Sequence, residues 1–410
     1  MDAKTVRDVD VAGRRVLVRA DLNVPLDDGR ISDDTRIRAS LPTLVHLLER
    51  GATVILASHL GRPKGKVNDA LRLKPVADRL SQLLGRPVRM TGDALGPGVQ
   101  VAVGKLRPGD LLLLENLRFH AAEEANDPEF AAALASHADL YVNDAFGAAH
   151  RAHASTEGIT HHLPAVAGLL MEREVDALSR LLTKPPRPFH AVIGGAKVSG
   201  KLEVLESLLG RCQAVLVGGG MANTFLAARG LELGKSLVEA DQLDNAERIV
   251  VMARSKRVRL MLPTDAVVAP QIHRRARTQI VAVDAVAKDQ MIVDIGPQTR
   301  AAFAEHLAKA KTIFWNGPMG VFEIPQFAEG TNEMARVIAR RTAAGAISIV
   351  GGGDSVAAVE QLGLADRMTH VSTGGGASLE YIEGKTLPGV EALLPADAEI
   401  TFPEDDAWAR

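Results

Sequence analysis

The chain has 410 residues, of which 46% are hydrophobic and 24% are charged. This balance is typical of folded globular proteins and excludes a disordered or fibrous chain. The 48 lysines and arginines nearly cancel the 50 aspartates and glutamates, which gives a formal net charge of −2. Because the total charge shows no sign of a basic face, we expect neither a nucleic acid nor a membrane as a partner.

The single cysteine, Cys212, excludes an intrachain disulfide and a zinc site made of cysteines. The first eleven residues alternate charged and apolar side chains and lack the apolar stretch of a signal peptide. No segment approaches the run of about 18 uncharged apolar residues that a membrane helix needs. From these features we expect a soluble cytoplasmic protein.

Short apolar runs typical of buried strands recur along the chain. Between many of them, apolar residues recur at helical spacing, as in 41–48, 76–84, 202–209 and 334–338. Apolar strands that alternate with amphipathic helices predict parallel sheets covered on both faces, and therefore an α/β fold. The predicted strands are 15–19, 53–57, 111–114, 140–142, 191–193, 214–217, 258–262, 280–283, 313–315 and 347–350.

These strands are too many for one open sheet, so we expect two lobes, each with a mostly parallel, Rossmann-like sheet flanked by helices. A proline-rich break at 184–188 follows a segment with a helical pattern at 171–182. A helix that runs into such a break suits a connector between lobes. We therefore expect lobes at 1–170 and 189–393, joined by a hinge helix and linker at 171–188.

Clusters of glycine follow the predicted strands of the second half, at 194–195, 218–220, 351–353 and 374–376. Glycines at strand ends let backbone N–H groups approach a phosphate, and the N-terminus of a following helix adds positive charge. One such cluster alone is more often a tight turn needed for packing. Four clusters in one half favour a nucleotide site.

Two common nucleotide fingerprints fail in this half. The Walker pattern is nearly complete from Gly195 to Lys201, but Leu202 occupies the position that needs a hydroxyl for Mg²⁺. No cluster completes the G-x-G-x-x-G pattern of dinucleotide-binding proteins. The nucleotide site is therefore expected to be of another kind.

Cationic and polar residues follow the predicted strands of the first half. Arg19, Asp21 and Asn23 alternate after the first strand, so on an extended segment their side chains point the same way. Guanidinium groups match phosphate and carboxylate, so arginines that share this placement predict a cradle for an anion. The other members of the set are Arg36, His59, Arg62, Arg118 and Arg151.

At this point the sequence resembles the phosphoglycerate kinase family over essentially its whole length. Each motif is moderately specific, and their order along the chain is very specific. The motifs are RVLVRADLNVP at 15–25, SHLGRP at 58–63, HRAHAS at 150–155, GGAKVSGK at 194–201, WNGPMGVFE at 315–323 and GGGDS at 351–355.

The resemblance implies reversible phosphoryl transfer between ATP and the carboxylate of 3-phosphoglycerate, which gives ADP and 1,3-bisphosphoglycerate, a step of glycolysis and gluconeogenesis. It assigns phosphoglycerate to the first lobe and ATP with Mg²⁺ to the second, and it implies that 394–410 packs back on the first lobe. Family members are usually monomers. The phosphoglycerate ligands would be Asp21, Asn23, Arg36, His59, Leu60, Gly61, Arg62, Arg118 and Arg151. The nucleotide ligands would be Lys197, Lys201, Gly219, Asn316, Glu323, Gly351, Gly352, Gly353, Asp354 and Ser355, with Asp354 at the metal.

Because a carboxylate nucleophile is already ionised at neutral pH, the reaction needs no general base. It needs neutralisation of charge and in-line alignment of the reacting groups. The expected catalytic groups are Arg36, Lys201 and the loop at Gly374 and Gly375. Two substrates on two lobes also imply a hinge that closes and excludes water.

Three other functions remain open at this stage. A two-lobe solute-binding module would bind without turnover, although such proteins are exported. A catalytically silent homologue would lack a charged site residue, and none is missing at the matched positions. A nicotinamide-dependent dehydrogenase would need the glycine fingerprint that is absent here.

Overall fold

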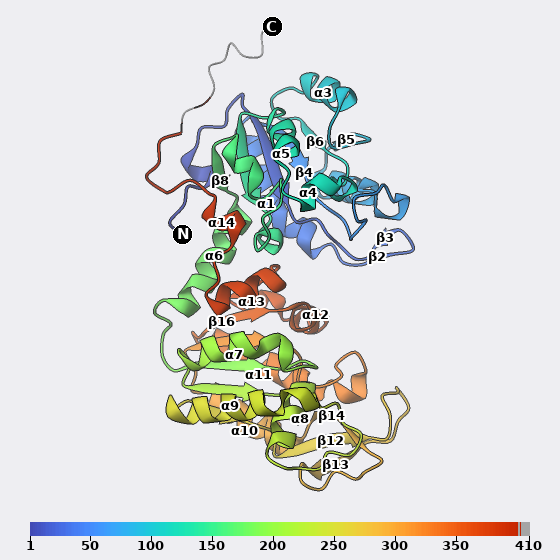
Figure 1. Cartoon of the computed structure of the whole chain (residues 1–410), viewed down its shortest axis with the longest axis vertical. Coiled ribbons are helices and arrows are strands. Elements are labelled where there is room, and N and C mark those ends of the chain that lie inside the picture. The colour runs from blue at the N-terminus through green and yellow to red at the C-terminus, as the bar shows by residue number, and fades with distance from the viewer. Residues whose placement is uncertain (401, 403–410) are drawn as a thin grey trace. The chain divides into compact units, whose positions relative to one another are not determined.

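Parallel sheets flanked by helices organise the chain, as the sequence predicts (Figure 1). The structure is a computed structural model that describes residues 1–400 and 402. Contacts divide the chain into two compact units. The first unit contains Met1–Asp176 together with the chain from Thr386 onward, and the second unit is the continuous segment Ala177–Lys385.

The sheet of the first unit has the strand order β5-β6-β4-β1-β7-β8, and all its neighbouring strands are parallel. Val18 in the central strand pairs with Leu56 on one side and Val142 on the other, and all three side chains are buried. The strands are β1 (Arg15–Ala20), β4 (Thr53–Ala57), β5 (Arg89–Met90), β6 (Leu111–Leu113), β7 (Leu140–Asp144) and β8 (Ala165–Ala167). A short antiparallel hairpin, β2 (Leu26–Asp27) and β3 (Arg30–Ile31), follows β1.

Helices of the first unit bury one apolar stripe against this sheet. In α1, for example, Ile37, Leu44 and Leu47 are fully buried at helical spacing. These side chains join the strand residues in one core cluster. The helices are α1 (Thr35–Glu49), α2 (Lys74–Leu84), α3 (Pro97–Gly104), α4 (Ala121–Glu124), α5 (Pro128–Ala135), α14 (Pro388–Glu391) and the start of α6 (Leu169–Leu182).

The second unit has a parallel sheet of the order β11-β10-β9-β15-β16-β17. Ala191 pairs with Val215 and with Phe314, which places these strands at its centre. The strands are β9 (Phe189–Ile193), β10 (Ala214–Val217), β11 (Arg259–Met261), β15 (Thr312–Asn316), β16 (Ile347–Gly351) and β17 (His370–Val371). The helices are α7 (Leu202–Leu209), α8 (Gly219–Ala228), α9 (Leu243–Ser255), α10 (Pro297–Leu307), α11 (Glu329–Ala343), α12 (Gly353–Gln361) and α13 (Gly376–Glu383).

One predicted strand lies outside the parallel sheets. The segment predicted at 280–283 forms β13 (Gln279–Ala282), which pairs antiparallel with β12 (Asp265–Ala269). A third strand, β14 (Met291–Ile295), completes this antiparallel sheet on the other side of β12. Because β13 is an edge strand whose residues are mostly exposed, it lacks the two-sided burial that a parallel strand has.

The unit boundaries differ in detail from the expected domain limits. Residues 386–393 contact the first unit, whereas we expected them in the second lobe. The reason is visible in α14, where Gly389 N donates to Ala149 O and Gly389 O accepts from Asn143 Nδ2, both at 2.9 Å. The other boundary lies within α6, between Asp176 and Ala177, inside the segment expected to connect the lobes. Of the expected C-terminal segment 394–410, residues 401 and 403–410 lie outside the described residues.

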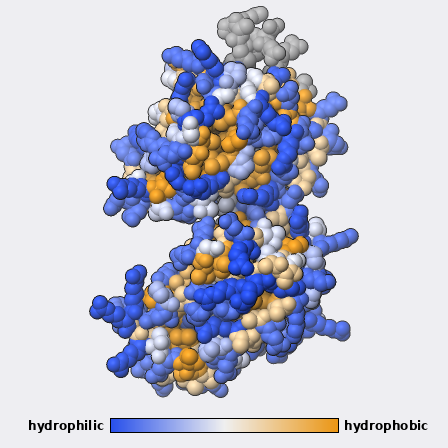
Figure 2. Space-filling view, turned by 180° about the vertical axis from the view of Figure 1, so that it is seen from behind, coloured by the Kyte–Doolittle hydropathy of each residue, from blue (hydrophilic) through white to orange (hydrophobic). Residues whose placement is uncertain are grey.

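The surface of the described residues combines hydrophilic and hydrophobic side chains. Among the described residues, no helix combines the length and hydropathy needed to cross a membrane. Figure 2 shows hydrophilic residues over much of one face, with hydrophobic residues visible between them on both units. Two exposed hydrophobic side chains, Leu237 and Ile272, line a cavity in the second unit.

Candidate active site

The parallel strands of the first unit end in polar and cationic side chains. Asp21 directly follows β1 and His59 follows β4, while Arg118 lies in a 3-10 helix (Leu117–Phe119) after β6. Because these strands are parallel neighbours, their carboxyl ends meet at one edge of the sheet. This edge is where ligands bind in open α/β sheets.

Arg36 joins this edge from the first turn of α1. Its Nη1 atom donates to Asp21 Oδ2 at 2.9 Å and to Asn23 O at 3.3 Å. Asn23 Oδ1 in turn accepts from the backbone N–H of Gly61 at 2.8 Å, which ties the β1 loop to the β4 loop. The structure therefore brings four of the predicted residues into one bonded cluster.

Arg118 lies nearly buried beside the same loop, with a side chain that is 10% exposed. It donates from Nη1 to Gly61 O at 3.1 Å, and its Nε is 3.5 Å from Glu124 Oε1. The buried Nε makes no hydrogen bond within the part of the chain that is described. Burial, with repulsion from Arg19, lowers the pKa of Arg118. A buried guanidinium with an unused donor is well suited to bind an anion.

His59 and Leu60 are buried, at 4% and 1% exposure. Burial is the largest cause that holds the pKa of His59 well below its usual value, followed by the charges of Arg19, Arg118 and Arg36. The imidazole is therefore neutral at physiological pH. Leu60 offers a ligand only its backbone, whose N–H donates to Asn116 Oδ1 at 3.3 Å.

Arg62 and Arg151 are exposed, and no ion pair joins them to the cluster in the described residues. Arg151 donates from Nε to His150 Nε2 at 3.2 Å. Both guanidinium groups are therefore accessible to an anion.

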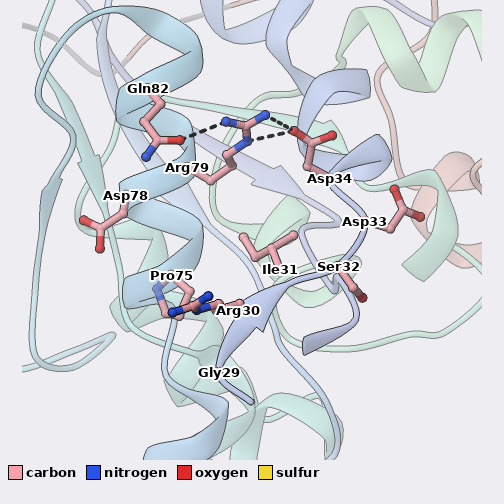
Figure 3. A pocket seen from close by; sticks show the side chains of 10 residues that line it. All are labelled: Gly29, Arg30, Ile31, Ser32, Asp33, Asp34, Pro75, Asp78, Arg79 and Gln82. Atoms are coloured by element: carbon pink, nitrogen blue, oxygen red, sulfur yellow. Dashed lines mark hydrogen bonds and ion pairs between the residues drawn. The ribbon is translucent and has the colours of Figure 1, made fainter. Parts of the chain in front are cut away.

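A hollow of about 600 Å³ lies beside α1 and contains none of the predicted ligands (Figure 3). Figure 3 shows Arg79 of α2 reaching Asp34, the residue that precedes α1. Arg79 donates from Nε to Asp34 Oδ2 at 2.8 Å, and Arg38 donates from Nε to Asp34 Oδ1 at 2.8 Å. These bonds anchor the first turn of α1, the turn that presents Arg36.

In the second unit, glycine-containing turns follow the strands and line a cavity of about 440 Å³. Gly219, at the start of α8, has φ +67, and a Cβ there would lie 2.7 Å from Gly195 N and 2.8 Å from Pro318 O. Only glycine fits such a close approach of three turns. Of the predicted nucleotide ligands, the cavity is lined by Gly219, Glu323 and Asp354.

Lys201 extends beneath these turns. Its Nζ atom donates to Gly194 O at 2.7 Å and to Asn316 O at 3.2 Å. Burial lowers the pKa of Lys201 to about 8, although the charge of Asp354 opposes this shift. A Cβ on Gly317 would lie 2.6 Å from Nζ, so the glycine at 317 makes room for this ammonium.

The turn after β16 is joined to the turn after β15. Asn316 Nδ2 donates to Gly351 O at 2.9 Å, and Ser355 Oγ accepts from Gly317 N at 2.5 Å. Gly352, with φ +87, precedes α12 and brings its backbone against the amide of Asn316. Asn316 and Ser355 are therefore buried supports of the loop, while Gly353 and Asp354 are exposed at the start of α12.

Lys197, Gly374 and Gly375 are among the predicted residues of this unit that do not line the cavity. Lys197 is exposed, and Gly374 and Gly375 lie at the start of α13, where Gly375 has φ +51. Gly374 N donates to Ser372 Oγ at 3.1 Å. The free N–H groups of a helix start can bind an anion, which suits the expected role of this loop.

The donor set at Asp354 fits a magnesium ion that takes most of its ligands from phosphate and water. Mg²⁺ in phosphoryl-transfer sites is bound through one or two carboxylates plus substrate phosphates. Asp354 supplies one exposed carboxylate beside the glycine turns. Across residues 1–400 and 402, no three His, Cys, Asp or Glu side chains gather into a metal site of their own.

The cavity also contains residues that the sequence does not reveal as ligands. Leu237 and Ile272 are 49% and 55% exposed at its wall, and β14 forms another part of it. These residues lie far apart along the chain, so no local motif unites them. Exposed aliphatic side chains in a concave site are the signal of a flat apolar ligand such as a nucleobase, but it is visible only after folding.

Comparison with known proteins gives the family. A family model described as "Phosphoglycerate kinase" matches residues 6–385. A protein named phosphoglycerate kinase from Moorella thermoacetica is 57% identical over 389 residues, which cover 95% of this chain and 98% of the relative. The chain belongs to the phosphoglycerate kinase family. Another phosphoglycerate kinase, from Chloroflexus aggregans, is 56% identical over 97% of this chain and 100% of its own length.

Solved structures of phosphoglycerate kinases share this fold. The phosphoglycerate kinase of Coxiella burnetii superposes with a TM-score of 0.85 at 43% identity, covering 95% of this chain and 98% of that one. The phosphoglycerate kinase of Pyrococcus horikoshii OT3 gives 0.84 at 35% identity, with the same coverage. The expected α/β fold with two sheets is confirmed, and so is the kinase activity of a phosphoglycerate kinase.

Proposed function

We propose that this phosphoglycerate kinase family member binds 3-phosphoglycerate on the first unit and ATP with Mg²⁺ on the second. The contrast between the two strand edges supports the proposal. Cationic side chains converge at the edge of one sheet, and glycine turns surround a partly apolar cavity at the edge of the other. An acidic three-carbon substrate needs the first kind of site, and a nucleotide needs the second.

On the first unit, cationic and polar groups together bind the anionic substrate. Asp21 and Asn23 bind the hydroxyl and carboxylate region, and the backbone of Leu60 and Gly61 lines the loop between them. The phosphate and carboxylate charges are matched by Arg36, Arg62, Arg118 and Arg151, and the neutral ring of His59 adds a hydrogen bond. The cluster of Arg36 with Asp21 and of Arg118 with Gly61 supports this assignment, since both guanidiniums are already oriented toward one edge.

On the second unit, the apolar wall takes the base and the glycine turns take the phosphates. Gly219, Asn316, Glu323 and the loop Gly351–Gly353 surround the nucleotide, while Lys197, Lys201 and Ser355 bind or support its phosphates. Asp354 would hold Mg²⁺, which when bound supplies positive charge to the phosphate oxygens. Lys201, whose ammonium is bonded to Gly194 O and Asn316 O, supplies a fixed cation at the turns.

The transfer proceeds without a general base, because the attacking carboxylate is already ionised. Charge spreads over the phosphoryl oxygens in the transition state, so catalysis rests on cations and N–H groups held in place. Arg36 from the first unit and Lys201 from the second fulfil this role, with the N–H groups at Gly374 and Gly375. We propose that the units close about α6 when both substrates are bound, which excludes water from the acyl phosphate.

We further propose that the protein acts as a cytoplasmic monomer. Each substrate is bound by one unit of a single chain, so the site needs no residue from a second copy. Sedimentation at micromolar concentration tests the monomer directly.

A steady-state assay tests the function. Purified protein with MgATP and 3-phosphoglycerate is coupled to NADH oxidation through acyl-phosphate reduction. We expect turnover that requires both substrates and stops with EDTA, with the coupling enzymes controlled separately. Folded protein that binds both ligands without turnover would be a silent homologue. Protein that binds ligand but transfers nothing, and shows no need for the nucleotide, would favour a solute-binding module.

A further inference from the structure

Arg19 is a fully buried cation that the proposed chemistry does not use. Its side chain has 0% exposure, yet it follows the core residues Val16, Leu17 and Val18 along β1. A buried charge is costly unless hydrogen bonds and an opposite charge compensate it. The contacts of Arg19 therefore show which groups compensate its charge and which group it orients.

One contact of Arg19 is with His59. Arg19 Nη2 lies 3.0 Å from His59 Nδ1, inside the buried cluster. A guanidinium has only donors, so the ring nitrogen that faces it must accept. Nδ1 therefore has no proton, and the single proton of the neutral imidazole is on Nε2. Nε2 has no hydrogen-bond partner among the described residues, which leaves this N–H available to a ligand.

The opposite side of Arg19 is fixed by a buried carboxylate through a serine. Arg19 Nε donates to Ser155 Oγ at 2.8 Å, and Ser155 Oγ donates to Glu123 Oε1 at 2.6 Å. Ser155 N also donates to Glu123 Oε2 at 3.0 Å, and Glu123 is fully buried. This chain of bonds compensates the charge of Arg19 and sets the direction of its guanidinium.

We infer that Arg19 is a positioning residue, which holds His59 as the Nε2–H tautomer so that the ring donates a hydrogen bond to an oxygen of the anionic substrate. The inference rests on the proposed binding of phosphoglycerate by His59. A neutral donor adds a directed hydrogen bond without adding another cation to a site that already contains Arg36 and Arg118. Because the tautomer is already fixed in the free protein, substrate binding does not have to supply the free energy that would select it.

The charges around His59 act in the same sense. The groups that face it are Arg19 from β1, Arg118 after β6, Arg36 from α1, and His153. All of them disfavour a positive charge on the ring, in addition to burial, so the pKa of His59 stays well below its usual value. We expect the ring to remain neutral at neutral pH and somewhat below it, where a free histidine would titrate.

The test measures the tautomer in the ligand-free protein. Long-range ¹H–¹⁵N correlation spectra of labelled protein distinguish protonated from bare ring nitrogens, and His59→Gln assigns the His59 signals. We expect a bare Nδ1 and a protonated Nε2 across this pH range. A proton on Nδ1 would overturn the inference even if the enzyme turned over normally.

Arg19→Met, which removes the donors at similar volume, tests the role of the residue. We expect mixed tautomers at His59, a KM for 3-phosphoglycerate raised on the order of 10- to 100-fold, and a nearly unchanged KM for ATP. Arg19→Met with the wild-type tautomer and KM would overturn the inference.

Two companions separate positioning from folding. Glu123→Gln leaves Arg19 in place beside His59. The tautomer of His59 should therefore stay that of wild type, even if thermal stability falls. Arg19→Met combined with Glu123→Gln restores charge balance in the core. If this folded double variant recovered the wild-type tautomer, Arg19 would not be what sets it. Wild-type protein with the expected tautomer but without turnover would contradict the proposed function and leave the tautomer assignment standing.

Discussion

The strand edges of the two units are built from different parts of the chain. In the first unit, the strand edge is made of charged side chains that hold one another, such as Arg36 with Asp21. In the second unit, the edge is made of backbone brought close by glycines, such as Gly219 against Gly195 and Pro318. The proposed ligands account for this difference, since a small acid offers charge, whereas a nucleotide offers a large surface and a row of phosphates.

The largest expected effect is the loss of Arg36. Arg36→Ala removes the proposed transition-state cation of the first unit, at a cost of about 2–4 kcal/mol in the activation barrier, or roughly 30- to 1000-fold in kcat. The thermal midpoint should change little, although Asp21 loses its partner. Steady-state kinetics and calorimetry measure both. Arg50→Ala, at an exposed residue directly after the same helix, is the control and should retain kcat; wild-type kcat in Arg36→Ala would contradict the assignment.

The second prediction concerns Lys201, whose ammonium lies beneath the glycine turns of the second unit. Lys201→Met should lower kcat on the order of 100-fold, while binding of 3-phosphoglycerate, measured by calorimetry, stays unchanged. Because burial lowers the pKa of Lys201 to about 8, the ammonium loses its proton as pH rises through 8, so kcat should fall there. Lys201→Arg should move this decline to higher pH. An unchanged alkaline limb in that variant would assign it to another group, and Lys309→Met is the surface control.

A methyl group at Gly219 should affect the nucleotide alone. Gly219→Ala places a Cβ 2.7 Å from Gly195 N, in a turn with φ +67. We expect the KM for ATP to rise on the order of 10-fold and stability to fall by about 1 kcal/mol or more. Gly230→Ala is the matched control, since it has φ +84 but no atom within 4 Å of the added Cβ. Equal KM effects in both variants would mean that backbone strain, and not the close approach, is responsible.

The smallest expected effect concerns stability and not turnover. Burial raises the pKa of Asp144 to about 6, against the hydrogen bonds that it accepts from Leu170 N and Met171 N. The folded protein therefore holds a proton that the unfolded chain releases near pH 4, so the free energy of unfolding falls as pH rises from about 4 to 6, by up to about 3 kcal/mol. Urea unfolding across this range measures the slope.

Asp144→Asn cannot titrate and should flatten that slope. Asp69→Asn, at an exposed side chain, should leave it as in wild type. A full wild-type slope in Asp144→Asn would show that another group gains the proton.

The sequence correctly predicted those strands and helices that a local pattern of residues determines. Strand β4 at 53–57 and helix α7 at 202–209 match their predicted limits, because continuous apolar runs and helical stripes are local signals. The edge strand β13 was assigned to the wrong kind of sheet, since its apolar letters do not tell how many faces are covered. The return of 386–393 to the first unit was missed, because a contact such as Asn143 with Gly389 joins residues far apart in the chain.

The same limit applies to the candidate site. Arg36 and Asp21 could be assigned to one anion site from the sequence, and Lys201 to the nucleotide site from its glycine-rich motif. The burial of Arg19 could not, since charged residues are almost never fully buried without a partner, and its partners Ser155 and Glu123 lie more than a hundred residues away. The apolar wall at Leu237 and Ile272 likewise exists only in the folded chain.

The interrupted first unit has a consequence for how the protein is made. Its edge near β8 is completed by residues after Thr386, where Lys4 N donates to Leu394 O at 2.8 Å and Leu394 N donates to Ala165 O at 2.9 Å. These bonds cannot form until the whole second unit has left the ribosome. Ala177–Lys385, being continuous, can complete its fold while the N-terminal half still waits for its last segment. The half that is synthesised first is therefore the half that finishes last.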